Sequence, residues 1–172
     1  DYAFATIDVE TMLASANDPG AFMTASSTEF DGAMNALANS LAQAEYGSGS
    51  GAMGQVLATP ANAATTVITL TSPEAITSFE VGQVLNVWSA ETGGTQRSTD
   101  GTVLNMTVSA VDRDAGKITI SAVYNGSGTI AANDYIFAQG DRGGKLKGLA
   151  AWLPAVAPVA GDNFFGVDRS AD

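Results

Sequence analysis

The sequence predicts an α+β fold, in which one long helix precedes a small antiparallel β-barrel or β-sandwich. Two observations carry this prediction. Apolar residues recur at alternating spacings of four and three over residues 30–44, as they do on one face of a helix. Residues 64–140 are instead rich in Thr, Val and Ile and carry turn signals at short intervals, which is typical of short paired strands.

The helical part begins with a short extended piece at residues 2–7 and a short helix that Asp8 can cap. The long helix is predicted over residues 19–46, because Asp18 suits the N-cap, Pro19 the first helical position and Gly47 the position after the end. Such a helix is roughly 42 Å long. Because its apolar residues form one narrow stripe, the helix must pack that stripe against a larger body of protein. A start at residue 27 is the alternative, because Ser26 and Glu29 could form a capping box.

Residues 47–54 are rich in Gly and Ser and are predicted to be a flexible junction. A phosphate-binding loop is disfavoured, because the segment follows a helix and lacks a Gly-Lys-Ser/Thr sequence. Strands are then predicted at residues 65–70, 84–89, 103–111, 117–123 and 135–138. Asp112, Asp114 and Gly116 resemble part of a calcium loop, but the further oxygen ligands are missing, so a hairpin turn is favoured.

These patterns divide the chain of 172 residues into three parts. Residues 1–54 form an N-terminal helical segment, and residues 55–142 form the β-barrel-like unit. Residues 143–172 form an irregular apolar segment, because Gly143 and Gly144 end the alternation and later prolines prevent a long regular helix.

Composition argues against several functions. The net charge of −11 disfavours direct binding to nucleic acid or to anionic membranes, and no apolar run is long enough to span a membrane. The absence of His and Cys removes the commonest general base, disulfides and most zinc sites. We predict no catalytic residue, no cofactor, no metal and no enzymatic activity. A hydrolase that uses paired carboxylates, such as Glu74 with Glu80 or Asp162 with Asp168, is an alternative for which no constellation is visible. Phe79, Trp88 and Tyr135 could line a carbohydrate-binding face, although core positions are the commoner role of such residues.

The C-terminal segment contains the candidate interface residues. Trp152, Phe164 and Phe165 carry large apolar surfaces that need burial, either in further protein or against a partner. Asp168 and Arg169 lie next to them and could form an intersubunit ion pair beside an apolar anchor, or else a charged turn within the chain. The chain starts without Met and ends soon after these aromatic residues, so we expect it to be a fragment.

An ordered series of short segments resembles the major capsid proteins of tailed bacteriophages. The NDPGAF run at 17–22 resembles the start of that family's long spine helix, and EYGSGSG at 45–51 resembles the exit from it. FEVGQVL at 79–85 and the VDRDAG turn at 111–116 resemble a β insertion found in some members. GLAAWLP at 148–154 and FGVDRS at 165–170 resemble the return to the main domain.

The resemblance implies a structural subunit of a phage or prophage head. It implies self-association into pentamers and hexamers of an icosahedral shell, location in the virion after assembly in the host cytoplasm, and no catalysis. The family's chains are longer, so the main domain would be incomplete here. The competing hypothesis, from the barrel-like region, is a carbohydrate-binding or adhesive β module on a helical stalk.

Overall fold

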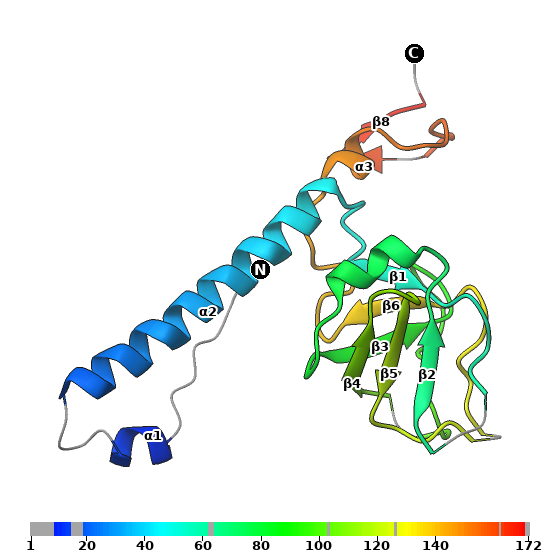
Figure 1. Cartoon of the computed structure of the whole chain (residues 1–172). Coiled ribbons are helices and arrows are strands. Elements are labelled where there is room, and N and C mark those ends of the chain that lie inside the picture. The colour runs from blue at the N-terminus through cyan, green and yellow to red at the C-terminus, as the bar shows by residue number, and fades with distance from the viewer. Residues whose placement is uncertain are drawn as a thin grey trace.

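The computed structural model describes residues 9–14, 19–61, 64–102, 104–125, 127–161 and 163–170. Figure 1 shows a mixed α+β molecule, with one long helix and a six-stranded antiparallel sheet, as predicted. The predicted extended piece at residues 2–7 and the predicted caps Asp8 and Asp18 lie outside the described residues.

Helix α2 (Pro19–Tyr46) has the predicted bounds, and the short α1 (Val9–Ala14) precedes it. The alternative start at residue 27 is wrong, because the helix already includes residues 19–26. The Ser26 hydroxyl does not cap a helix start but donates to the Phe22 carbonyl at 2.8 Å, one turn earlier. Thr24, Ser27 and Thr28 make the same type of bond to the preceding turn.

The sheet, which together with its loops we call the β unit (residues 52–138), has the strand order β1-β6-β3-β4-β5-β2. All neighbouring strands run antiparallel. The strands are β1 (Ala52–Gln55), β2 (Thr66–Thr69), β3 (Val84–Trp88), β4 (Met106–Asp112), β5 (Lys117–Ile120) and β6 (Tyr135–Ala138). The turn between β4 and β5 is a hairpin, in which the Asp112 carboxylate accepts from the Ala115 amide at 3.0 Å.

The antiparallel sheet does not close into a barrel. Edge strands β1 and β2 meet in one isolated bridge, Val56 with Leu70, and share no continuous ladder. Two hydrogen bonds flank this bridge, from the Leu57 amide to the Thr69 carbonyl at 2.8 Å and from the Thr71 amide to the Gln55 carbonyl at 2.9 Å. The chain leaves β2 for the 3₁₀ helix η1 (Pro73–Ser78) directly after the bridge, so pairing cannot extend further.

The junction after α2 is packed, and its prediction as a flexible linker is wrong. β1 pairs with β6, with Ala52 opposite Phe137 and Gln55 opposite Tyr135. Before it, Gly51 adopts φ 83°, and a Cβ at this position would lie 2.4 Å from the Asp141 carbonyl oxygen. Glycine is therefore needed here for close backbone approach as well as for the turn.

The hydrophobic core lies inside the β unit. All six strands line it, β1 through the half-buried Met53, together with η1 and the segments that flank β1 and β6. Its fully buried members include Val56, Ile68, Leu70, Phe79, Leu85, Val87, Met106, Ile118, Ile120, Ile130 and Ile136. A register shift between Val108 and Ala110 interrupts the alternation of β4, so Ala110 is exposed although simple alternation along the strand would place it on the buried face with Met106 and Val108.

A buried ion pair joins two loops at one end of the sheet, the β3–β4 connection and the β5–β6 connection. Asp134 is 2% exposed, and its carboxylate lies 3.0 Å from Arg97 Nε while also accepting from Arg97 Nη2 at 3.2 Å. The same carboxylate accepts from the Ala131 amide at 2.7 Å. Nearby, the Tyr124 hydroxyl donates to the Ile130 carbonyl at 2.8 Å. These bonds fix the long connections on either side of β4 and β5.

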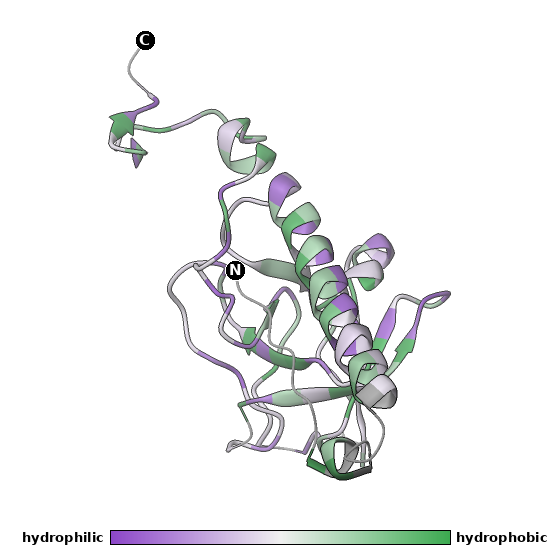
Figure 2. Ribbon diagram, turned by 90° about the vertical axis from the view of Figure 1, so that its left-hand side faces the viewer, coloured by the Kyte–Doolittle hydropathy of each residue, from purple (hydrophilic) through white to green (hydrophobic). Residues whose placement is uncertain are grey.

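The segment 141–148 holds α2 against the β unit. Lys145 pairs with Asp141 at 2.9 Å and donates to the Ser40 hydroxyl on α2. The Gly148 amide donates to the Gly47 carbonyl at 3.1 Å, and a Cβ on Gly148 would lie 2.2 Å from the Ala44 carbonyl oxygen. Figure 2 shows hydrophobic residues along the whole of α2, most of which extends beyond this attachment.

Candidate interaction surface

The C-terminal segment folds back on itself and forms an aromatic cluster of Trp152, Phe164 and Phe165. Helix α3 (Leu149–Trp152) supplies the Trp, and the hairpin of β7 (Asn163–Phe164) and β8 (Val167–Asp168) supplies both Phe residues. Ring centroids lie 4.8 Å apart for Trp152 and Phe164, 5.7 Å for Trp152 and Phe165, and 4.7 Å for the two Phe rings. Three of the five predicted interface residues thus meet in one cluster.

The hairpin turn places Phe165 in an uncommon conformation. Phe165 has φ 51° and Gly166 has φ 83°, and positive φ at both central residues characterises a type I′ turn. Bulky residues rarely occupy this region, and the left-handed conformation costs about 1–2 kcal/mol. The turn keeps the Phe165 side chain 70% exposed beside the Trp152 ring.

Two cations flank the cluster. Lys147 Nζ lies 5.0 Å from the Phe164 ring centroid and 5.1 Å from that of Phe165. The Arg169 guanidinium lies 4.6 Å from the Phe164 centroid, and its Nη1 donates to the Ala151 carbonyl at 2.6 Å. All three distances between a cation and a ring centroid suit cation–π attraction. Lys147 is not among the predicted residues. The sequence signal that could have found it is its position at the start of the apolar segment, two residues after Lys145.

Asp168 acts within the chain, where it closes the hairpin. Its carboxylate accepts from the Ser170 amide at 2.9 Å, from the Ser170 hydroxyl at 2.7 Å and from the Gly161 amide at 3.3 Å. The bonds from the Ser170 amide and hydroxyl, and then that from the Gly161 amide, lower the pKa of Asp168 below its ordinary value of 3.8. The intersubunit ion pair of Asp168 and Arg169 remains a prediction.

The lowered pKa of Asp168 predicts that the hairpin loosens in acid. A carboxyl whose folded pKa is depressed stabilises the fold above its unfolded pKa and loses that contribution as pH falls through the folded pKa. We expect the Ser170 amide resonance to shift in a titration whose midpoint lies below 3.8. Asp168→Asn is the matched control and should abolish this transition. A midpoint at or above 3.8 would contradict the hydrogen bonds to this carboxylate.

The two Phe residues should differ in their effect on the local stability of the hairpin. Phe164 is 9% exposed between Trp152 and the two cations, whereas Phe165 is largely exposed. Truncation of a buried Phe costs about 3–5 kcal/mol. Phe164→Ala should therefore lower the free energy of opening the hairpin by an amount at the lower end of that range. Phe165→Ala should cost less than about 1 kcal/mol and relieve some backbone strain. Hydrogen exchange of the β7 and β8 amides measures both, and equal losses would show that Phe164 is not packed between Trp152 and the cations.

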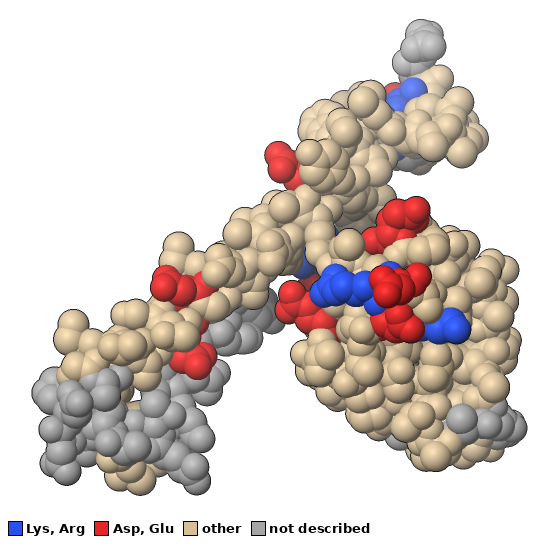
Figure 3. Space-filling model, viewed as in Figure 1, with Lys and Arg blue, Asp and Glu red and all other residues tan. Residues whose placement is uncertain are grey.

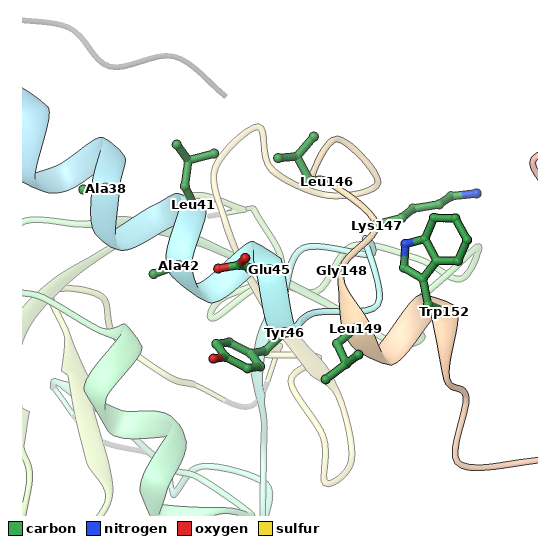
Figure 4. Close-up of a pocket in the computed structure, with 10 residues that line it drawn as sticks. All are labelled: Ala38, Leu41, Ala42, Glu45, Tyr46, Leu146, Lys147, Gly148, Leu149 and Trp152. Atoms are coloured by element: carbon green, nitrogen blue, oxygen red, sulfur yellow. The ribbon is translucent and has the colours of Figure 1, made fainter.

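An open apolar groove of about 840 Å³ lies between the end of α2 and the C-terminal segment. Figure 4 shows its lining, with the last turns of α2 on one side and residues 146–152 on the other. Leu41 and Tyr46 come from α2, and Leu146, Leu149 and Trp152 come from the opposite wall. All five side chains are exposed, so they extend the exposed apolar surface that begins at the aromatic cluster.

Helix α2 carries a second exposed apolar surface, the α2 stripe, on the face formed by Met23, Phe30, Met34, Leu37 and Leu41. Met23 and Met34 are each 69% exposed and Phe30 is 59% exposed. Contiguous exposed rows of large apolar side chains such as this one are candidate interaction sites.

The aromatic residues of the β unit do not form an exposed platform. Phe79 is fully buried in the core, and Trp88 and Tyr135 are half-buried. The Arg142 guanidinium covers the Trp88 ring at 3.9 Å from its centroid and donates to the carbonyls of Ala90 and Gly93. Flat aromatic stacking with a sugar at Trp88 would therefore require displacement of Arg142.

Among the described residues, no group of three or more acidic side chains is placed to hold a metal ion. Nor does any helix in this part of the chain have the length and apolar character needed to cross a membrane. The exposed apolar surfaces described above, namely the aromatic cluster, the groove beside it and the α2 stripe, are the candidate interaction surfaces. No protein-family model, curated protein or solved structure matches this chain.

Proposed function

We propose that this protein is a structural subunit of a self-assembled shell, namely the major capsid protein of a tailed bacteriophage or prophage. The observation that carries the proposal is the contrast between a self-contained β unit and the exposed apolar surfaces outside it. The β unit buries a full core, whereas the α2 stripe and the aromatic cluster expose large side chains. A subunit that self-assembles can bury such apolar surfaces against its neighbours. A carbohydrate-binding β module on a helical stalk does not require them.

The ordered resemblance to phage capsid proteins supports the same proposal. The long helix corresponds to the spine-like element, and the β unit corresponds to the insertion after it. In this role the protein is not an enzyme and needs no cofactor. Its partners are further copies of itself, arranged as pentamers and hexamers, and its location is the virion after assembly in the bacterial host. The acidic surface suits a wall that encloses DNA without binding it.

Electron microscopy of the purified protein over a range of concentrations tests the proposal. We expect ring-like or shell-like particles of uniform size, together with a concentration-dependent mass in sedimentation. A protein that stays strictly monomeric at all concentrations would overturn the proposal. Glycan binding that is lost on Trp88→Ala would favour the adhesive module instead.

A further inference from the structure

Charge is distributed unevenly between the two exposed apolar surfaces. Residues 1–54 contain seven acidic residues and no Lys or Arg. On α2 the described acids Glu29, Asp31 and Glu45 are all exposed. The aromatic cluster differs, because Lys147 and Arg169 lie against its rings, while the carboxylate of the neighbouring Asp168 bonds to Ser170 and Gly161 within the hairpin. Figure 3 shows acidic side chains along α2, both acidic and basic ones on the β unit, and basic ones beside the C-terminal segment.

The aromatic cluster and the Met23–Met34 part of the α2 stripe lie far apart along α2. The aromatic cluster lies beyond the C-terminal end of the helix, whereas Met23 and Phe30 occupy its N-terminal half and Met34 lies just past its middle (Figure 1). Glu29 and Asp31 belong to the same turns as Phe30, so the negative charge flanks this part of the stripe. One molecule therefore cannot bring its own cluster onto this part of its own helix without bending α2.

We infer that the aromatic cluster of one copy docks on the Met23–Met34 part of the α2 stripe of the next copy. Trp152 and Phe165 would cover Phe30 and Met34, with Lys147 and Arg169 facing Glu29 and Asp31. Trp and Arg are enriched among the residues that dominate interface energies, and exposed charges at the rim set orientation. This inference deepens the proposed function and rests on it.

Charge favours this head-to-tail arrangement over symmetric pairing. Two α2 stripes placed face to face would bring acidic residues together, and two aromatic clusters would bring Lys147 and Arg169 against their copies. A contact between unlike surfaces avoids both repulsions. Such heterologous contacts generate closed rings when the rotation between copies closes. The inferred contact would thus supply one of the interfaces of a pentamer or hexamer.

Charge reversal on each surface separately tests the inference in the full chain. The first variant is Lys147→Glu, and the second combines Glu29→Lys with Asp31→Lys on exposed helical positions. Each should weaken self-association in sedimentation by about tenfold, because reversal turns attraction into repulsion at an exposed contact. Lys117→Glu is the matched control, because it makes the same charge change on β5, away from both surfaces. Far-UV circular dichroism checks that each variant is folded.

Complementation decides whether the contact joins unlike surfaces. A chain with all three substitutions, and a mixture of the first and second variants, should each recover wild-type association within about threefold. Association that neither reversal weakens, or weakened association that neither combination restores, would overturn the inference. If the wild type and the charge-reversal variants form the same shells in electron microscopy, this contact alone is refuted and the proposed function stands. A strictly monomeric wild type refutes the proposed function and this contact with it.

Discussion

Phe79→Ala is expected to lower the free energy of unfolding of the β unit by about 3–5 kcal/mol, because it removes a large ring from the closed core. Phe79 is fully buried at the end of η1, where its backbone amide donates to the Ile76 carbonyl at 3.2 Å. Its ring reaches across to β1, and a Cβ on Gly54 would lie 3.5 Å from two of its carbons. Removal of the ring therefore leaves a cavity between η1 and the sheet, which neighbouring backbone cannot fill.

Urea unfolding followed by circular dichroism measures this loss, with the half-buried Trp88 as a fluorescent reporter. Phe165→Ala is the matched control, because it deletes the same ring from an exposed position outside the β unit. The control should leave the midpoint of β-unit unfolding unchanged. A loss below about 1 kcal/mol for Phe79→Ala would show that η1 does not pack closely on the sheet.

Asp134→Ala is expected to destabilise the β unit by about 3 kcal/mol, because it leaves Arg97 and the Ala131 amide without their carboxylate partner. The value is placed at the low end of the range for buried pairs, since the Arg97 side chain is 27% exposed and water can solvate it. Arg97→Ala should cost less, because the Asp134 carboxylate keeps its bond from the Ala131 amide.

A double-mutant cycle of Asp134→Ala and Arg97→Ala isolates the coupling between the two side chains. We expect a coupling of about 1–2 kcal/mol in thermal or urea unfolding. Asp114→Ala, on the exposed β4–β5 turn, provides the matched loss of an acidic side chain and should change stability by less than about 0.5 kcal/mol. Additive effects of the two substitutions at Asp134 and Arg97 would contradict the ion pair.

The long helix and most strands could be placed from the sequence, because their signals are local. Pro19 and Gly47 mark the helix ends, and the bounds of β6 match their prediction. β1 was missed, because its Gly- and Ser-rich surroundings have little strand propensity of their own. The pairing with β6 and the space that Gly54 leaves for Phe79 make it a strand, and neither is visible in local sequence.

The candidate surface was predictable in composition and not in arrangement. The large aromatic residues Trp152, Phe164 and Phe165 make the C-terminal segment a candidate interaction surface by composition, but their convergence depends on the positive φ of Phe165. No propensity rule would place Phe there, because Asn or Gly normally fills such a turn. The different exposures of Phe164 and Phe165 follow from that one residue, so they too could not be predicted from the sequence.

The single bridge between Val56 and Leu70 has a consequence for the protein at high local concentration. An unpaired sheet edge is a template on which strands of other molecules can add, and that leads to aggregation. Here the bridge and its flanking hydrogen bonds pair this stretch of backbone of the two edges, so it is not open to another molecule. In the proposed assembly, copies would meet through side chains on α2 and in the aromatic cluster, while this part of their sheets stays separate. The bridge would thus limit the pairing of sheet edges that competes with ordered assembly.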